Sequence, residues 1–166
     1  MPITPLHAFS LMFLYFKNKK RFDPLALAVS ATFIDLEPLY YFLVGEPLNH
    51  RIWHGFALAI TVYPILVAMG VYVLERLFEK KLWSAYNILR LKPNQVQYPL
   101  FIVYLCSLLS SFTHVFFDMF THKDMPYVIY PFVYGNPFYL GNASILIEII
   151  VIALAVYSLY VWIKAK

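Results

Sequence analysis

The chain has 166 residues, of which 61% are hydrophobic and 19% aromatic, while only 13% are charged. Soluble domains carry about 25% charged residues, so the composition excludes an ordinary water-soluble domain and indicates one transmembrane domain over residues 1–166. The net charge of +4 does not favour nucleic acid as a partner, because the basic residues are placed as topology signals. The single cysteine, Cys106, excludes a disulfide framework and a cysteine-rich metal cluster.

Five apolar stretches follow one another along the chain. The first, residues 5–16, is short for a full crossing, so we expect a partly shielded helix packed against the others. The remaining four meet the requirement of about 20 residues for crossing the hydrocarbon core, and they cover residues 24–44, 53–74, 98–120 and 143–163. The sequence therefore predicts an all-α polytopic membrane helix bundle with four or five spans.

The second stretch contains Pro38, three residues after Asp35. A proline removes a helical hydrogen bond and disfavours helical geometry in the preceding residue, so we expect a kink that frees the carbonyl near Ile34. Without a kink, Asp35 and Glu37 would diverge on the helix. The kink would let both carboxylates face one cavity.

Two longer segments lie between the stretches. Residues 75–97 carry mixed charge followed by Lys92-Pro93-Asn94, which predicts a solvated surface helix and then a turn. Residues 121–142 combine proline and glycine with many aromatic side chains, which predicts an irregular, aromatic outer loop at the membrane interface.

Lysine and arginine are distributed unequally between the segments that join the stretches. Eleven lie in residues 17–21, 75–97 and 164–166, whereas Arg51 and Lys123 alone lie on the other side. By the positive-inside rule, we expect a multi-pass protein of the plasma membrane with a cytoplasmic C-terminus. In this predicted topology, all five histidines and four of the acidic residues fall near the extracytoplasmic face: His7, His50, His54, His114, His122, Asp35, Glu37, Asp118 and Glu148.

The residues His114, Asp118 and His122 are spaced four apart inside an apolar run, so on a helix they share one face. Ionisable groups at that depth are costly and usually functional, which makes a buried metal site the first hypothesis. A lone histidine in an apolar helix is, however, often an interhelical hydrogen-bond partner.

The other polar positions leave more than one interpretation open. His50 and His54 form a second pair four residues apart; we favour a solvated interfacial turn for His50 more than for His54, which stands at a helix start. His7 follows Thr4-Pro5 and is expected in the first turn of a short helix. Glu148 is either a partner of a ligand or paired with a tyrosine or histidine.

The order His7, Asp35, His54 and His114-x-x-x-Asp118 resembles the membrane-bound metal-dependent hydrolase family of small multi-pass prokaryotic proteins. The similarity runs from Met1 to about Ser144 and includes Met1-Pro2-Ile3-Thr4-Pro5-Leu6-His7 and Thr121-His122. Ile34 stands where that family usually has proline, and Gly55 stands where serine often follows the histidine. The segment from His50 to His54 is one residue tighter than in some members.

The residues and the resemblance together predict a hydrolase that holds one or two divalent ions near the outer face. Imidazole and carboxylate ligands without thiolate suit zinc, and also manganese or iron. We expect an amphiphilic substrate, a lipid-headgroup type of ester or phosphoester, attacked by metal-activated water. The expected ligands are His7, Asp35, His54, His114 and Asp118, with Glu37 as the general base and His122 in an outer or substrate-contacting role.

Other classes remain open at this point. The histidines suit haem in an electron-transfer protein, although Asp35 and Asp118 count against a haem pocket. The same groups suit an ion transporter, although the sequence has no internal repeat to support alternating access. A closed structural metal site is a further alternative, and the oligomeric state is left open.

Overall fold

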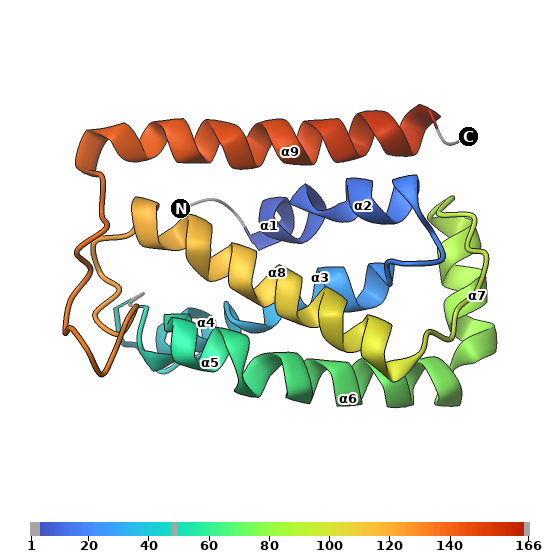
Figure 1. Cartoon of the computed structure of the whole chain (residues 1–166), viewed down its shortest axis with the longest axis horizontal. Coiled ribbons are helices and arrows are strands. Elements are labelled where there is room, and N and C mark those ends of the chain that lie inside the picture. The colour runs from blue at the N-terminus through green and yellow to red at the C-terminus, as the bar shows by residue number, and fades with distance from the viewer. Residues whose placement is uncertain (1–3, 48–49, 165–166) are drawn as a thin grey trace.

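The computed structural model describes residues 4–47 and 50–164, and within them every regular element is a helix (Figure 1). The α-helices are α1 (Thr4–Ser10), α2 (Met12–Lys17), α3 (Pro24–Phe33), α4 (Leu36–Leu43), α5 (Phe56–Ile60), α6 (Val62–Leu77), α7 (Glu79–Ile88), α8 (Leu100–Thr121) and α9 (Ser144–Lys164). Two short 3₁₀ turns, η1 (Ile52–His54) and η2 (Gly141–Ala143), complete the set.

The long helix α8 lies at the centre of the bundle and contacts α3, α5, α6 and α9. In Figure 1, α9 and α6 run along opposite long sides of the molecule, α7 lies at one end, and α4 and α5 lie at the other. The first apolar stretch forms α1 and α2, which pack against α9 and α3. This confirms the short helical segment packed against the others.

Within residues 4–47 and 50–164, two helices are long and apolar enough to cross a membrane: α8 with 22 residues, and α9 together with η2 with 24. Counting the bent pair of α3 and α4 as one span gives three. The expected four or five spans are not confirmed, because the third stretch is divided into η1, α5 and α6. Its last break, at Thr61, precedes Pro64, whose missing N–H cannot bond the carbonyl of Ile60.

The predicted kink in the second stretch is present, with an angle of 43° between α3 and α4. Helix α3 ends at Phe33, and the N–H of Glu37 donates to the carbonyl oxygen of Ile34 at 3.2 Å. That bond takes up the carbonyl that Pro38 cannot reach, because proline has no N–H. Asp35 therefore lies at the break, between the end of α3 and the start of α4.

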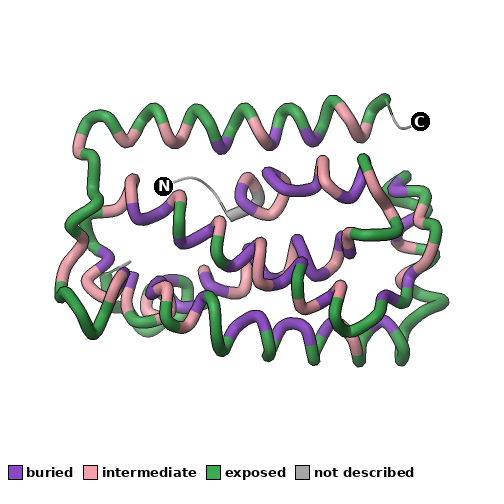
Figure 2. Tube along the Cα trace, viewed as in Figure 1, coloured by how far each residue is buried: buried purple, intermediate pink, exposed green. Residues whose placement is uncertain are grey.

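The outer surface of the bundle is apolar. Figure 2 shows α9 largely exposed, whereas buried positions concentrate on the inner helices. The exposed side chains of α9 include Ile145, Ile149, Ile152, Val156 and Ile163. Such a continuous apolar surface is unfavourable in water and suits contact with lipid.

The structures of residues 75–97 and 121–142 agree only in part with the surface helix and the irregular outer loop predicted for them. Residues 75–97 form the end of α6, α7 and a turn, but Glu75 is fully buried, which corrects the solvated reading. Its Oε2 atom accepts the N–H of Tyr98 at 2.9 Å. The outer loop is irregular as expected, and it also buries Met125 and Val128 completely. It is therefore a packed part of the bundle.

Candidate metal centre

Polar side chains gather at the end of the bundle that holds α4, α5 and the outer loop. The ring centroids are 4.5 Å apart for His7 and His114, 4.3 Å for His50 and His54, and 4.2 Å for His50 and His122. Five histidines from three segments of the chain, α1, residues 50–54 and residues 114–122, therefore converge. This confirms the convergence that the distribution of histidines along the predicted topology indicated.

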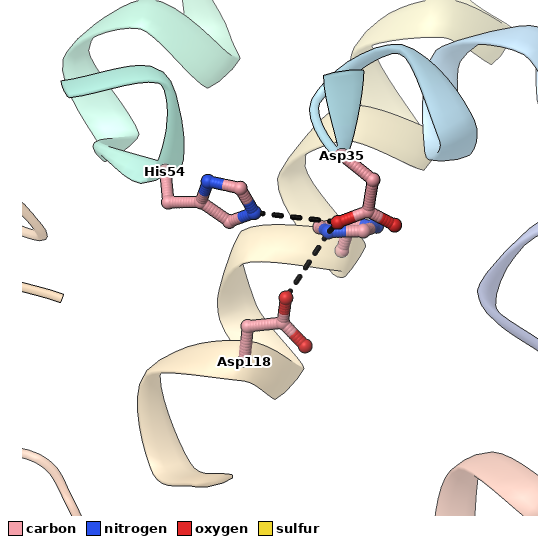
Figure 3. A group of neighbouring side chains, drawn as sticks. Asp35, His54 and Asp118 are labelled. Atoms are coloured by element: carbon pink, nitrogen blue, oxygen red, sulfur yellow. Dashed lines mark hydrogen bonds and ion pairs between the residues drawn. The ribbon is translucent and has the colours of Figure 1, made fainter. Parts of the chain in front are cut away.

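Four residues form the first group of potential metal ligands: Asp35, His54, His114 and Asp118. One ligand atom from each lies within 4.8 Å of the others. The Nε2 atom of His114 is 3.1 Å from Asp118 Oδ2 and 3.3 Å from Asp35 Oδ1. Figure 3 shows His54 and Asp35 pointing toward each other from separate elements, with Asp118 rising from α8.

Several of these ligand atoms are hydrogen-bond acceptors that face one another, an arrangement that suits a bound cation. His54 Nδ1 lies 3.1 Å from Glu37 Oε2, which makes Nδ1–H the donor and leaves a lone pair on Nε2. In the neutral ring that Nε2 atom is an acceptor 3.4 Å from Asp35 Oδ1, and a cation between the two atoms would satisfy both. His114 Nε2 and Asp118 Oδ1 are also buried without a hydrogen-bond partner in the described chain.

Serine hydroxyls fix α8 in the position that brings His114 and Asp118 to the break in the second stretch. Ser110 Oγ donates to the carbonyl of Leu27, and Ser111 Oγ donates to that of Ala59, each at 2.6 Å. Interhelical bonds of this kind replace water inside a membrane protein. We did not single out these serines in the sequence, although they share the helix face of His114.

Glu37 is buried, and both of its carboxylate oxygens accept hydrogen bonds. Its two oxygens accept the N–H groups of Arg51 at 2.9 Å and Trp53 at 3.0 Å, besides the contact with His54. A carboxylate that orients a ligand histidine typically fixes its tautomer and raises its affinity for the metal. These contacts favour a positioning role over the expected role as general base.

His7 and Glu148 lie outside the first group. The Nε2 atom of His7 is 3.2 Å from Asp118 Oδ1, so His7 adjoins one ligand. Glu148, on α9, is half-buried and belongs to no ligand group among the described residues. The start of the proposed family motif, residues 1–3, lies outside the described residues.

A second group of potential ligands comprises His50, Asp118 and His122, again within 4.8 Å of one another. His122 follows the end of α8 with φ −114° and ψ 117°, so the shared helix face predicted for three residues holds only for His114 and Asp118. The side chain of Asn136 holds this end by donating to the carbonyl of His122 at 2.6 Å.

His50 is buried rather than solvated, which corrects the interpretation favoured from sequence. Its Nδ1 atom lies 3.1 Å from Asp124 Oδ2, and this contact lowers the pKa of Asp124 to about 2. Burial lowers the pKa of His122 to about 4, so its imidazole is neutral at pH 7, the form that binds metals. Asp124 was not anticipated, although it lies two residues from His122.

Two pockets adjoin the ligand groups. The polar pocket, of about 490 Å³, is lined by side chains that include His50, Arg51, Lys123, Asp124 and Tyr127. The apolar pocket, of about 330 Å³, is lined by Asp35 together with Val29, Phe33, Leu36 and Leu39. The centre can therefore be approached from a polar side and from an apolar side.

Comparison with known proteins places the chain in a family that carries no assigned activity. A family model described as a domain of unknown function, DUF4184, matches residues 1–159. Comparisons with curated proteins and with solved structures gave no significant match. Because the match spans nearly the whole chain, the protein belongs to the DUF4184 family.

Proposed function

We propose that the protein is a membrane-embedded metal-dependent hydrolase acting on an amphiphilic ester or phosphoester. The observation that carries this proposal is the first group, in which two imidazoles and two carboxylates from three segments of the chain converge on one largely buried space. Buried charges without compensation are expensive. A divalent cation would compensate them.

The donor set suits zinc best, with manganese or iron as alternatives. When bound, such an ion lowers the pKa of a water ligand and polarises the oxygen of a substrate ester. His54, His114 and Asp118 are buried and would hold it. The side chain of Asp35 is 19% exposed and borders the apolar pocket, so it would be the ligand nearest the substrate.

The two pockets support an amphiphilic substrate. A polar headgroup suits the pocket lined by Arg51 and Lys123, and an acyl chain suits the pocket lined by Phe33 and Leu39. His122 adjoins the polar side and keeps its expected outer role. Since both pockets meet the ligand groups, the scissile bond would lie where the polar and apolar parts join.

We also propose the full topology on which this function depends. The broken third stretch would cross as one unit, which raises the number of spans to four, or to five if the segment of α1 and α2 also crosses. Eleven basic residues on one side would then be cytoplasmic. The centre would lie near the extracytoplasmic face of the plasma membrane.

The first test of the proposal is metal content. Detergent-purified wild-type protein should carry a divalent ion by elemental analysis, and His114→Ala and Asp118→Ala should lose it. Loss of a direct ligand should exceed the roughly 10–100-fold cost of losing a second-shell partner. Glu148→Gln, a carboxylate outside both groups, is the matched control and should retain the ion.

The second test is turnover. Metal-loaded protein in nanodiscs should hydrolyse a chromogenic phosphoester or ester bearing an acyl chain, and Asp35→Asn should abolish this. Folded protein that holds its ion but cleaves neither class would overturn the hydrolase and favour a structural or transport role. A haem band in the visible spectrum of the purified protein would overturn the metal-ligand assignment itself.

A further inference from the structure

We infer that the centre is dinuclear: a second divalent ion is held by His50, His122 and Asp118, and Asp118 bridges the two ions. The substrate class in this inference rests on the proposed function. The second metal site itself rests only on the geometry of the residues. Asp118 is the shared member of both groups of mutually close ligand atoms. A carboxylate has two oxygens and can serve two cations at once.

The position of Asp118 suits a bridge. Its Oδ2 atom faces His114 Nε2 at 3.1 Å, within the first group. Its Oδ1 atom is buried and lies 3.2 Å from His7 Nε2, and neither of these two atoms makes a hydrogen bond among the described residues. One oxygen therefore faces His114 and the other faces His7, and each oxygen keeps a further lone pair that a second cation could use.

Asp124 lies beside both histidines of the second group, and its hydrogen bond with His50 is the arrangement typical of a metal-binding histidine. Asp124 adjoins the Nδ1 atoms of both rings, with its Oδ2 3.1 Å from His50 and its Oδ1 3.9 Å from His122. A carboxylate on one ring nitrogen leaves the other nitrogen as the ligand atom. The ring centroids of His50 and His122 are only 4.2 Å apart, which places both ligand atoms beside the same space.

The second group also lies on the path from the polar pocket. His50 and Asp124 line that pocket, so an ion beside His50 would be reached by a substrate headgroup before the first ion. Paired divalent ions clamp the attacking and leaving oxygens of an in-line displacement on phosphorus. The dinuclear centre therefore narrows the substrate class from esters in general to a phosphoester, with water as the co-substrate and an alcohol and a phosphate as products.

The test is the stoichiometry of Zn²⁺ and Mn²⁺ in the detergent-purified full chain. Wild-type protein should bind two ions per chain, and the double variant His50→Gln/His122→Asn should bind one, with the first ion retained. Asp118→Asn should weaken both. Glu148→Gln is the control and should still bind two.

Spectroscopy keeps the inference falsifiable if the double variant fails to fold. Wild-type protein loaded with Mn²⁺ should give the exchange-coupled electron paramagnetic resonance signal of two bridged ions, and Asp124→Asn should lower the affinity for the second ion about 10–100-fold. One ion per chain in wild type, with an uncoupled signal, overturns the dinuclear centre even if the protein is a hydrolase. Two coupled ions without any hydrolysis overturn the proposed function and leave the centre standing.

Discussion

Glu37 shows how contacts alter the role that a residue type suggests. A carboxylate beside an expected metal site indicates a general base, but each oxygen of Glu37 accepts a backbone N–H, and one also contacts His54. A base must have a lone pair directed at the proton that it removes. Glu37 instead joins the backbone at residues 51–53 to His54, a potential ligand, which is the arrangement of a positioning residue.

Glu37→Gln separates the two roles. If Glu37 is a positioning residue, its replacement by glutamine should lower the affinity for the metal about 10–100-fold. The NH₂ group of the glutamine would face a backbone N–H that the carboxylate oxygen accepts in the wild type. As a base, it would leave the metal bound and reduce turnover by roughly 10²–10⁴. Titration of the variant with Zn²⁺ distinguishes these outcomes, and unchanged affinity with reduced turnover would restore the base.

Asp35→Asn provides the comparison for that experiment. A neutral amide is a poorer ligand and leaves the partner charges uncompensated, so this variant should lose both metal and activity. Both variants preserve side-chain size, and a melting curve in the same detergent controls for folding. Metal retained at the wild-type level in Asp35→Asn would remove Asp35 from the ligand set.

At the scale of elements, the close contact between η1 and the outer loop positions His54. Phe56 N–H donates to the carbonyl of Val128 at 3.0 Å, and a Cβ on Gly55 would lie 2.6 Å from the carbonyl oxygen of Tyr127. No side chain fits there without a shift of backbone. This accounts for the glycine at position 55.

Gly55→Ala should therefore weaken metal binding without removing any ligand, because the shift moves η1 and the ring of His54. Zn²⁺ titration and thermal unfolding in detergent measure the effect. Gly70→Ala on α6 is the matched control, since nothing lies within 4 Å of its added Cβ, and alanine in a helix interior should stabilise by about 0.5–1 kcal/mol. Equal metal affinity in the two variants would contradict the role assigned to Gly55.

A second junction, at the opposite end of the bundle, joins the start of α3 to the end of α6. Asp23 and Glu75 are both fully buried, and the former accepts Leu25 N–H at 2.9 Å as an N-cap. Burial, and for Glu75 the neighbouring Asp23 carboxylate, raises the pKa of these two groups above the ordinary carboxyl range. In the folded protein the pair therefore retains a proton that the unfolded chain releases near pH 4.

Stability should fall as pH rises from about 5 to 9, since the folded state binds more protons than the unfolded state over this range. The contribution is complete below the ordinary carboxyl pKa near 4 and is lost as pH passes the raised pKa of Glu75. Glu75→Gln keeps an acceptor for Tyr98 N–H and should flatten the dependence of the melting temperature on pH. A slope equal to that of wild type would show that the pair does not share a proton.

For the whole molecule, orientation determines which face the centre serves. The distribution of lysine and arginine predicts that α7 is cytoplasmic and the outer loop extracytoplasmic. Lys81→Cys and Lys123→Cys, each in a Cys106→Ser background, introduce exposed thiols on the two sides. An impermeant maleimide applied to intact cells should label position 123 alone, and labelling of position 81 would reverse both the topology and the face of the centre.

The sequence by itself determined the helical class, the apolar surface and the pairing of His114 with Asp118 on one face of α8. Each depends on local chemistry: hydrophobic runs require lipid, and residues four apart share a helix face. It also located the break near Ile34, because the effect of Pro38 on its own helix is local. The positive-inside pattern further indicated that five histidines lie at one depth.

Only the tertiary structure decided which residues belong to which ligand group. His7, predicted as a ligand, lies 3.2 Å from Asp118 Oδ1 but outside both groups, while Asp124 was not expected and contacts His50. Glu75 was expected in solvent and is buried. Such outcomes depend on how segments far apart in sequence pack, and neither periodicity nor composition specifies the few ångströms that separate a ligand from its neighbour.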